Sequence, residues 1–391
     1  MFFKKSKSIR SLIDRKRKTA GSIRAVVSVM LSVLIVALAF TACASSNKPR
    51  EGFIGYDELG YALVPENDFH TKLQYSYLMN SDLGSATEYA QGVEELSRPR
   101  PFKLDFSDNE NIGDSIGYFL QYADNELFVD AVTVNLTEKF YDLYNLKLGQ
   151  NLYWRAAENE EELSAAEVKH FKVASVGPRN LFVDGVTNVR DIGGYDSFLV
   201  KGGKIRQGLF YRGAQLDDVT EEGVKTLVDV LGVKREIDIR NGEDMISPFK
   251  DDDDSPVGYF GVEIRNNTEP RRFSGFEEEY KMIYSIIAEA KEYPVYLHCQ
   301  AGADRTGLVV SMLLAVCGVG YEDIARDYMF TNFSTNGTRS LSAEYSFSKW
   351  WNELKKLKGK NHAEKAANWL RSKGVTDAQI QAIRKALIEG Y

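Results

Sequence analysis

The chain has 391 residues, of which 43% are hydrophobic, 27% charged and 12% aromatic. This composition excludes a disordered or collagen-like protein, and the length predicts two or three folded domains. The formal net charge is −7, and it becomes −15 if residues 1–42 are removed, so nucleic acid is not an expected partner.

The first 42 residues predict an export signal. Nine Lys and Arg residues precede an uncharged apolar run from Ala25 to Phe40, which has signal-peptide rather than full-span length. Residues 40–43, Phe-Thr-Ala-Cys, resemble the bacterial lipobox, with Phe40 in a place usually taken by Leu. The resemblance implies that Cys43 is lipidated and that the chain is exported and anchored to the outer face of a bacterial membrane. A retained membrane anchor is the alternative.

Residues 43–52 are small and polar, which predicts a tether. From residue 53 to 178, short apolar or alternating stretches are separated by Gly, Asn and Asp, and this pattern predicts a β-rich, sandwich-like domain. Residues 146–155 are similar to the turn into a late strand of fibronectin type III domains, although Tyr153 falls one place late. The breaker pair at 177–178, Gly-Pro, predicts the domain boundary.

Residues 179–391 alternate apolar strands with helical periodicity, which predicts an α/β domain with a mostly parallel sheet flanked by helices. The acidic run at 251–254 is interpreted as a solvated turn, because no spaced ligands accompany it, and we expect no metal or cofactor. The chain after Gly307 is expected to be mostly helical. The strands expected before it are 208–212, 233–240 and 294–299, and the helices are 220–231 and 276–291.

A ten-residue loop joins the expected strand at 294–298 to a buried helix expected from Leu308. A strand, a tight Gly-containing turn and a helix N-terminus together aim backbone N–H groups at one point, which makes a cradle for an oxyanion. The predicted phosphate-binding residues are Gln300, Ala301, Gly302, Ala303, Asp304, Arg305 and Thr306, preceded by His298 and Cys299 and followed by Gly307.

The residue types in this loop predict nucleophilic chemistry. Cys299 sits where the field of the loop favours a thiolate, so we expect a lowered pKa and a nucleophile. Arg305 can fold back and give bidentate hydrogen bonds to two phosphate oxygens. Thr306 can donate to the thiolate when it becomes a leaving group, and His298 is expected to order the loop rather than act as a base. Gly302 is expected to permit close backbone approach, and Gly307 to bring the helix near the sheet.

The pattern His-Cys-x-x-Gly-x-x-Arg-Thr-Gly resembles the signature of cysteine-dependent tyrosine and dual-specificity phosphatases. Residues 188–194, Asn-Val-Arg-Asp-Ile-Gly-Gly, resemble a box of the secreted bacterial tyrosine phosphatases, and three later segments match that group in order. The resemblance covers about residues 180–391 and implies hydrolysis of phosphate monoesters through a phosphocysteine. The later matching segments are 210–216, 237–240 and 374–383.

Three aspartates compete for the role of general acid, which must protonate the leaving oxygen. Asp304 lies in the loop, and in the resembled group the equivalent Asp is a favoured acid, so it is preferred. Asp238 ends an expected strand, with pairing to Arg240 or Arg212 as its structural alternative. Asp191 is expected to hold the turn in which it lies.

Several functions stay open at this point. The group often has Lys where this chain has Ala303, and the missing charge favours phosphotyrosine or mixed phosphoproteins over phosphoinositides. Residues 300–303 also resemble the loop of phytase-like enzymes, which keeps inositol polyphosphates as an alternative. An arsenate reductase or sulfurtransferase is disfavoured, because Cys317 is a poor shuttling partner. An extracellular binding protein with a vestigial phosphatase domain is the non-hydrolase alternative.

Overall fold

The computed structural model describes residues 53–391 except 241, 243–244, 251, 253 and 266–270. The expected signal segment, Cys43 and the tether therefore lie outside the described residues. Among the residues that are described, no helix combines the length and the apolar character that a membrane crossing requires.

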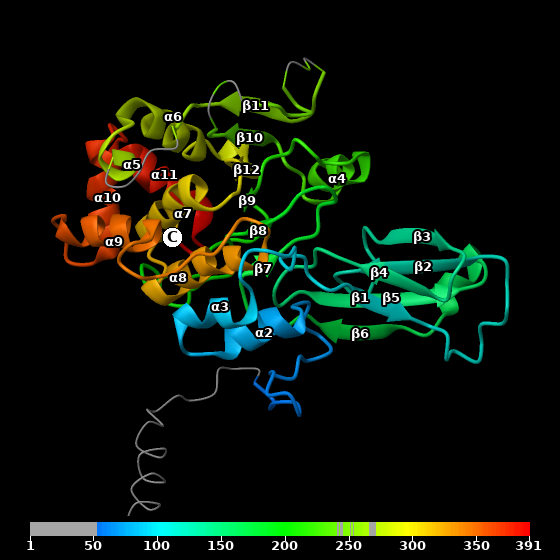
Figure 1. Ribbon diagram of the computed structural model, residues 1–391. Coiled ribbons are helices and arrows are strands. Elements are labelled where there is room, and N and C mark those ends of the chain that lie inside the picture. Colours follow the sequence, from blue (N-terminus) through cyan, green and yellow to red (C-terminus); the bar gives the residue numbers. More distant parts are fainter. Residues whose placement is uncertain (1–52, 241, 243–244, 251, 253, 266–270) are drawn as a thin grey trace, which may run out of the picture. The chain divides into compact units, whose positions relative to one another are not determined.

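Two antiparallel sheets form between residues 102 and 172 (Figure 1). Strands β1 (Phe102–Asp105) and β4 (Phe140–Leu143) make a two-stranded sheet, and the second sheet has the order β3-β2-β5-β6. Alternate side chains of both sheets enter one hydrophobic cluster, which includes Leu104, Leu120 and Trp154. The β-sandwich and fibronectin type III assignments stay predictions. The strands of the larger sheet are β3 (Val132–Leu136), β2 (Tyr118–Ala123), β5 (Asn151–Ala157) and β6 (Lys169–Lys172).

The expectation of β structure throughout residues 53–178 is wrong for the first part of that range. Helices α2 (Lys72–Met79) and α3 (Ala86–Tyr89) form there, joined by a 3-10 turn at Leu83–Ser85. Thr71 caps α2 in a reciprocal capping box with Gln74, a helix signal that the apolar pattern obscured. Several buried side chains of this segment belong to the hydrophobic core of the C-terminal α/β part, so the segment packs with that part. They include Tyr77, Leu78 and Ala86.

A six-stranded sheet organises the C-terminal part, and it is mostly parallel as predicted. Four neighbouring strands run parallel, and the last two pair antiparallel at one edge. The central strands are buried on both faces, as is typical of parallel sheets. In sheet order the strands are β11 (Gly258–Gly261), β10 (Arg235–Asp238), β12 (Val295–His298), β9 (Phe210–Gly213), β8 (Arg190–Asp191) and β7 (Arg179–Asn180).

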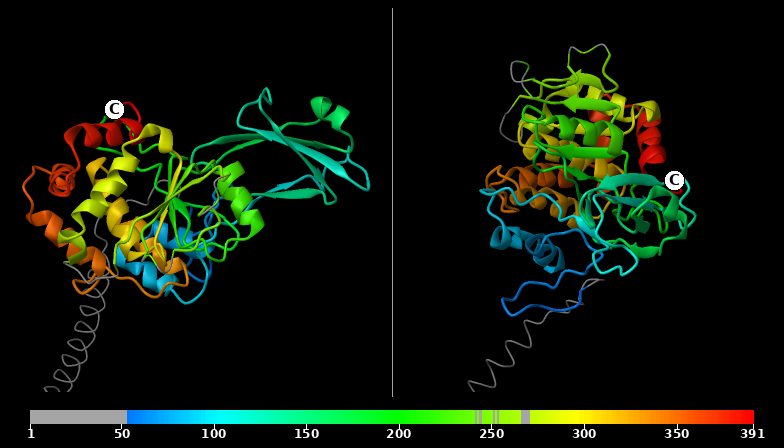
Figure 2. Two further views of the ribbon diagram at one scale, coloured as in Figure 1. Left: turned by 90° about the horizontal axis from the view of Figure 1, so that it is seen from above. Right: turned by 90° about the vertical axis from the view of Figure 1, so that its right-hand side faces the viewer.

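Helices cover both faces of this sheet (Figures 1 and 2). Leu297 faces the cluster that contains α6, α7, α10 and α11, whereas Tyr296 packs on the opposite face with Leu227, which follows α4. The helices of this part are α4 (Glu221–Lys225) with a π-helical turn (Thr226–Val230), α5 (Arg271–Ser274), α6 (Glu277–Ile287), α7 (Asp304–Val316), α8 (Tyr321–Met329), α9 (Ser346–Lys356), α10 (His362–Ser372) and α11 (Asp377–Leu387), with 3-10 turns at Ala290–Glu292 and Phe330–Phe333. A further 3-10 turn, Glu160–Ala165, lies beside β2 and β5.

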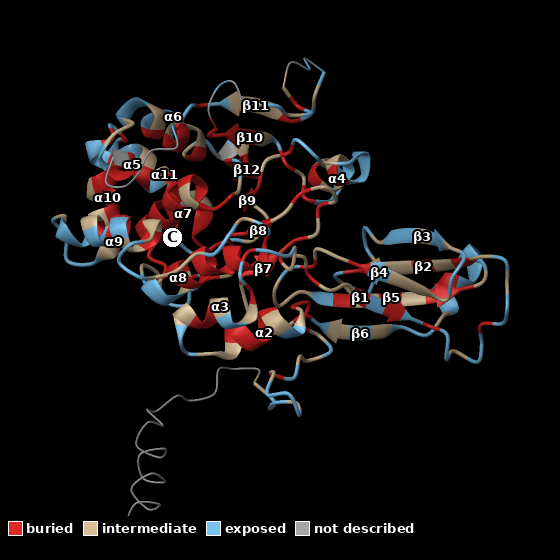
Figure 3. Cartoon of the chain, in the orientation of Figure 1, coloured by how far each residue is buried: buried red, intermediate tan, exposed pale blue. Residues whose placement is uncertain are grey.

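Helix α7 lies in the middle of the core. Every residue from Arg305 to Val316 is buried, and Figure 3 shows the helix in red among partly exposed neighbours. The helix begins at Asp304, four residues before the expected start at Leu308. Its first turn therefore belongs to the ten-residue loop, which places Asp304 and Arg305 at the helix N-terminus, where oxyanions bind well.

Candidate active site

The catalytic-loop candidate, residues 298–307, runs from the end of β12 into α7. Gly302 has a φ of +63°, and a Cβ at this position would lie 2.2 Å from the carbonyl oxygen of Gly213 at the end of β9. Only glycine fits such a left-handed, close approach. The predicted reason for Gly302 is confirmed by this geometry.

Four consecutive carbonyl groups of the loop are paired with donors outside it or at its edge. A ring nitrogen of His298 bonds the Cys299 carbonyl at 3.1 Å, and the N–H of Gln215 donates to the Gln300 carbonyl at 3.0 Å. The other two carbonyls, of Ala301 and Gly302, accept from side-chain amides and a guanidinium. In a trans peptide the N–H points away from the C=O, so the N–H groups of residues 300–303 turn to the inner side of the loop.

Side chains from distant parts of the chain hold the two remaining carbonyls. The amide nitrogens of Asn188 and Asn336 both donate to the Ala301 carbonyl, at 2.9 and 3.0 Å. The Nη2 of Arg212 donates to the Gly302 carbonyl at 2.7 Å. The predicted supporting role of Arg212 therefore takes the form of a direct contact with the loop.

A buried charge cluster fixes Arg212 in this position. Asp327 on α8 bonds the guanidinium of Arg212 with one oxygen and that of Arg190 with the other, the latter at 2.9 Å. The alternative in which Arg212 pairs with Asp238 is therefore wrong. Burial, followed by the nearby Arg190 charge, lowers the pKa of Arg212 to about 10, while Asp327 acts in the opposite direction. Arg212 therefore stays charged at neutral pH.

The thiol of Cys299 is buried and activated. Burial is the largest influence and by itself would raise the pKa, but the Arg305 charge and hydrogen bonds from Thr306 and Gly302 outweigh it, so the pKa lies below that of an ordinary thiol. For Cys317 burial is also the largest influence, and the opposing Arg384 charge does not outweigh it, so its pKa is raised to about 12. The direction expected for the Cys299 pKa from the sequence agrees with this result.

Arg305 lies on the first turn of α7 and is almost completely buried. Its Nη1 donates to the main-chain carbonyl of Ile264 at 3.2 Å and approaches that of Ile239 at 3.5 Å. These contacts orient the planar guanidinium beside the thiol, whose pKa it lowers. Such a fork matches two oxygens of a phosphoryl group.

His298 is a structural residue of the site. Its Nε2 bonds Glu236 at 2.8 Å and its Nδ1 faces the Cys299 carbonyl, so both ring nitrogens have acceptors. Burial lowers the pKa of His298, but the hydrogen bond to Glu236 and the charges of Glu236 and Asp238 raise it overall. A ring with both N–H groups engaged cannot take a proton, which supports the predicted ordering role.

Glu236, Asp238 and His298 are also the only group of three close metal-ligand types in the part of the chain that is described. Asp238 is bound in bidentate fashion by Arg240, with Nε–Oδ1 and Nη2–Oδ2 distances of 3.1 and 2.8 Å. Ser247 bonds the second oxygen of Glu236. Hydrogen bonds and the Arg240 charge therefore account for this cluster without a cation.

The three candidate acids occupy different environments. Asp238 is fully buried in its pair with Arg240, which is the structural alternative foreseen for it. Asp191 is fully buried and accepts from Arg179 at 2.7 Å and from the Gly193 N–H at 2.8 Å, so it holds its turn as expected. The Asp304 side chain is 28% exposed. Of the three, Asp304 is the one that solvent and a substrate can reach.

Asp304 is itself oriented by two donors. The Tyr328 hydroxyl donates to its Oδ1 at 2.8 Å, and Nη2 of Arg339 lies 3.1 Å from its Oδ2.

Gly307, one turn further along α7, lies against Tyr328 and Trp350, where a Cβ would meet them at 3.1 and 3.4 Å. The expectation that Gly307 serves close packing on the sheet is therefore wrong, because α8 and α9 cover that side of α7.

Several supporting residues escaped the sequence prediction. They are Asn188, Glu236, Asp327, Asn336 and Arg339. Asn188 stands in the recognised box of residues 188–194, which was a signal for importance but not for a contact with Ala301. The other four lie in strand, helix and loop sequences that match no motif, and their contacts with the site can be recognised only in the folded structure.

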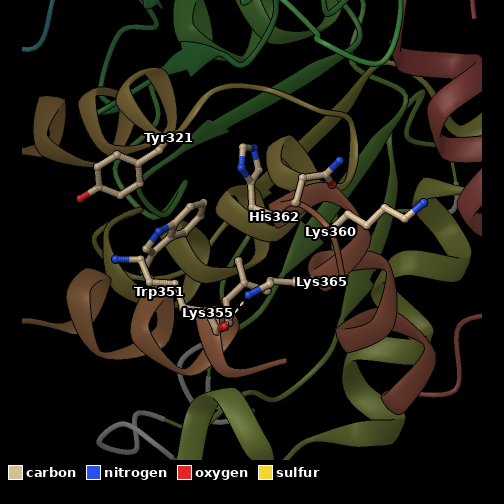
Figure 4. Close-up of a pocket in the computed structure, with 8 residues that line it drawn as sticks. Tyr321, Trp351, Lys355, Lys360, His362 and Lys365 are labelled. Carbon is tan, nitrogen blue, oxygen red and sulfur yellow. Dashed lines mark hydrogen bonds between the residues drawn. The ribbon is translucent and has the colours of Figure 1, made fainter. Parts of the chain in front are cut away.

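A cavity lies among α8, α9 and α10 (Figure 4). It has a volume of about 330 Å³, and none of the residues that line it belongs to the catalytic-loop candidate. Trp351 and Tyr321 form an aromatic pair there, with ring centroids 5.1 Å apart. In Figure 4 the ammonium group of Lys360 extends away from the other side chains, and Lys365 bonds the Lys355 carbonyl.

Comparison with known proteins identifies the family. The profile of the family described as "Tyrosine phosphatase family" matches residues 181–389, which is more than half of the chain. The chain belongs to the tyrosine phosphatase family. The matched range contains the whole loop from His298 to Gly307 and agrees with the extent of the resemblance seen in the sequence.

Two curated relatives carry the same kind of description. A tyrosine-protein phosphatase of Nostoc commune is 28% identical over 156 residues, which are 34% of this chain and 52% of that protein. The triple specificity protein phosphatase PtpB of Mycobacterium tuberculosis is 32% identical over 71 residues, 18% of this chain and 25% of that protein. The chain thus spans about half, or less, of the length of these relatives.

Two solved structures show a partial likeness to this chain. The core catalytic domain of the PP-IP phosphatase SIW14 of S. cerevisiae has a TM-score of 0.28 at 17% identity, covering 41% of this chain and 89% of that one. TpbA of P. aeruginosa has a TM-score of 0.25 at 18% identity, covering 49% and 95%. TM-scores this low do not establish a shared fold.

The two cysteines are expected to differ sharply in reactivity. Iodoacetate should alkylate Cys299 at neutral pH, with a rate that rises through a midpoint below the ordinary thiol pKa of about 8.5, because its lowered pKa yields thiolate at lower pH. Cys317 should stay unmodified up to pH 9, because its pKa is raised to about 12. Mass spectrometry of peptides after timed alkylation measures both rates. A Cys299 midpoint at or above 8.5 would contradict this assignment.

Proposed function

We propose that this chain hydrolyses phosphate monoesters through a phosphocysteine intermediate, and that its substrates are phosphotyrosine or mixed phosphorylated proteins. The observation that carries the proposal is the Cys299 thiol, whose pKa is lowered inside a loop with inward N–H groups and with Arg305 beside it. Membership of the tyrosine phosphatase family supports the reaction class.

In the first step, the Cys299 thiolate attacks phosphorus and the bond between phosphorus and the ester oxygen breaks. Arg305 and the loop N–H groups stabilise the charge that spreads over the phosphoryl oxygens. The leaving oxygen needs a proton, and we assign its delivery to Asp304, the candidate acid with an exposed carboxyl group. The products are the free alcohol and phosphocysteine.

In the second step, water attacks the phosphorus of phosphocysteine and the sulfur–phosphorus bond breaks. The carboxylate of Asp304 takes a proton from the attacking water, and inorganic phosphate leaves. Thr306 is among the groups that lower the pKa of Cys299, and its hydroxyl can donate to the sulfur when Cys299 leaves as a thiolate.

The substrate class rests on charge. Ala303 is completely buried and supplies no positive charge at a place where the resembled group often has Lys. A polyanionic inositol phosphate loses an attractive contact there, and the acidic chain does not replace it. The resemblance of residues 300–303 to phytase-like loops keeps inositol polyphosphates or phosphoinositides as the second candidate.

The place of the reaction is a separate part of the proposal. The basic leader, the apolar run and the lipobox-like residues 40–43 support export and attachment of Cys43 to the outer face of a bacterial membrane. Stable attachment requires more than one acyl chain, as expected for bacterial lipoproteins. If Cys43 is lipidated, the wild type should incorporate labelled palmitate and the Cys43→Ser variant should not.

The phosphatase activity is tested with the purified full-length chain and four substrates: phosphotyrosyl peptide, phosphoseryl peptide, phosphoinositide and inositol hexakisphosphate. Cys299→Ser should lower kcat at least about 1,000-fold, because serine is a far weaker nucleophile at neutral pH. Cys317→Ser is the matched control and should keep wild-type kcat. Equal phosphate release by wild type and Cys299→Ser would refute the enzyme, and fastest release from an inositol compound would refute the substrate class.

The acid assignment predicts a dependence on the leaving group. Asp304→Asn should lower kcat by roughly 100- to 10,000-fold for phenyl phosphate, whose leaving oxygen needs a proton, and far less for 2,4-dinitrophenyl phosphate. Asp238→Asn disturbs the pair with Arg240 and should affect both esters alike. If Asp238→Asn instead shows the selective loss, the acid is Asp238.

A further inference from the structure

A segment outside the matched family range contacts the support of the catalytic loop. Residues 91–97 precede residue 181, where the match begins, and lie outside the resemblance seen in the sequence. They run along residues 332–338, with main-chain hydrogen bonds of 2.8 Å from the Gly92 N–H to Asn332 and 2.9 Å from the Gly337 N–H to Gly92. The contact is close, because a Cβ on Gly92 would lie 2.4 Å from the Gly337 backbone.

The partner segment leads directly to the catalytic loop. Asn336 donates its side-chain amide to the Ala301 carbonyl at 3.0 Å, and Arg339 pairs with Asp304. The Leu96 N–H donates to the Phe333 carbonyl at 2.6 Å and so fixes the chain just before Asn336. Residues 91–97 therefore contact the segment that carries Asn336, one of the two side-chain amides that donate to the Ala301 carbonyl.

Ser97 holds Asn188, whose side-chain amide is the second donor to the Ala301 carbonyl. Its buried hydroxyl oxygen accepts from the Asn188 N–H at 2.9 Å, and the side chain of Asn188 donates to the same Ala301 carbonyl at 2.9 Å. Asn188 has a φ of +60°, an uncommon backbone conformation for a non-glycine residue, so an anchor on its N–H restrains it effectively.

Glu95 determines which way the Ser97 hydroxyl faces. The hydroxyl donates to Oε1 of Glu95 at 2.5 Å, and the Ser97 N–H donates to the same oxygen at 3.0 Å. With its proton directed to the carboxylate, the hydroxyl presents a lone pair to the Asn188 N–H. A chain of four residues, Glu95, Ser97, Asn188 and Ala301, thus reaches the catalytic loop.

We infer that Ser97, held by Glu95, is a positioning residue for the catalytic loop, acting through Asn188 on the Ala301 carbonyl; this inference rests on the proposed phosphatase function. The peptide between Ala301 and Gly302 carries that carbonyl on one side and the Gly302 N–H on the other. The Gly302 N–H is one of the groups that lower the pKa of Cys299. Fixing the carbonyl therefore aims an N–H at the nucleophile and at the bound phosphoryl group.

The test measures the pH midpoint of Cys299 alkylation by iodoacetate in full-length variants. Ser97→Ala should raise the midpoint by about half to one pH unit, the size expected from one weakened hydrogen bond to the thiolate. It should also weaken inhibition by vanadate, a phosphate analogue, about 3- to 10-fold. Ser97→Thr keeps the hydroxyl and should restore both values.

Ser85→Ala is the matched control. Ser85 is also buried and lies in the 3-10 turn Leu83–Ser85, and its replacement by Ala removes one hydrogen bond, from its hydroxyl to the Asp82 carbonyl at 2.7 Å, which does not lead to Ala301. Its alkylation midpoint should equal that of the wild type. If Ser97→Ala does not fold, Glu95→Gln, which keeps the volume but weakens the hold on the hydroxyl, should give a smaller shift in the same direction.

Two results would overturn the inference: a wild-type midpoint in the folded Ser97 or Glu95 variant, or an equal shift in Ser85→Ala. Alkylation does not require turnover, so the outcome is independent of the substrate. A chain that shows the predicted midpoint shift but hydrolyses none of the four esters would refute the proposed function alone. A chain that hydrolyses an ester without the shift would refute the positioning role alone.

Discussion

The pairing of four consecutive carbonyls on the outer side of the loop is the constraint on which the site depends. Residues 299–302 each have a donor for the carbonyl group, and the planar peptide turns the following N–H groups inward. A buried carbonyl without a donor costs about 1–3 kcal/mol, so each pairing disfavours other loop shapes. The lowered pKa of Cys299 and the phosphate cradle both follow from this arrangement.

Buried charge beneath the loop strengthens the same effect. Asp327 neutralises one of the two arginines, Arg190 and Arg212, that contact it, so the cluster keeps a positive charge close to the thiolate. The Cys299 thiolate in turn raises the pKa of Arg212, against the effect of burial. Loss of one partner from such a cluster typically costs about 3–5 kcal/mol, because an uncompensated charge stays buried. Charge and hydrogen bonding therefore depend on the same few side chains.

The structural unit that supports the loop is larger than the family match. Helix α2 contributes Tyr77 and Leu78 to the main core, and residues 91–97 contact both segments that hold Ala301. The antiparallel sheets between residues 102 and 172 have a hydrophobic cluster of their own. The boundary at residues 177–178 stays a prediction, and Tyr77, Leu78, Ala86 and Ala90, which precede it, belong to the core of the α/β part.

The sequence by itself determined the loop, because its function is encoded in adjacent residues. A strand, a Gly-containing turn at Gly302 and a following helix predict a cradle, and the spacing of six residues lets Arg305 fold back toward Cys299. The alternation of strands and helices likewise predicted the mostly parallel sheet, since burial on both faces leaves a continuous apolar pattern.

The tertiary structure decided everything that depends on residues far apart in the chain. Arg212 and Asp327 are 115 positions apart, and Ser97 and Asn188 are 91 apart, so no local period or motif connects them. The same holds for the candidate acids, because only the folded chain shows that Asp238 is buried against Arg240 while the Asp304 side chain is 28% exposed. The local sequence determines the backbone conformation of a turn, whereas tertiary packing determines which distant residues hold that turn in place.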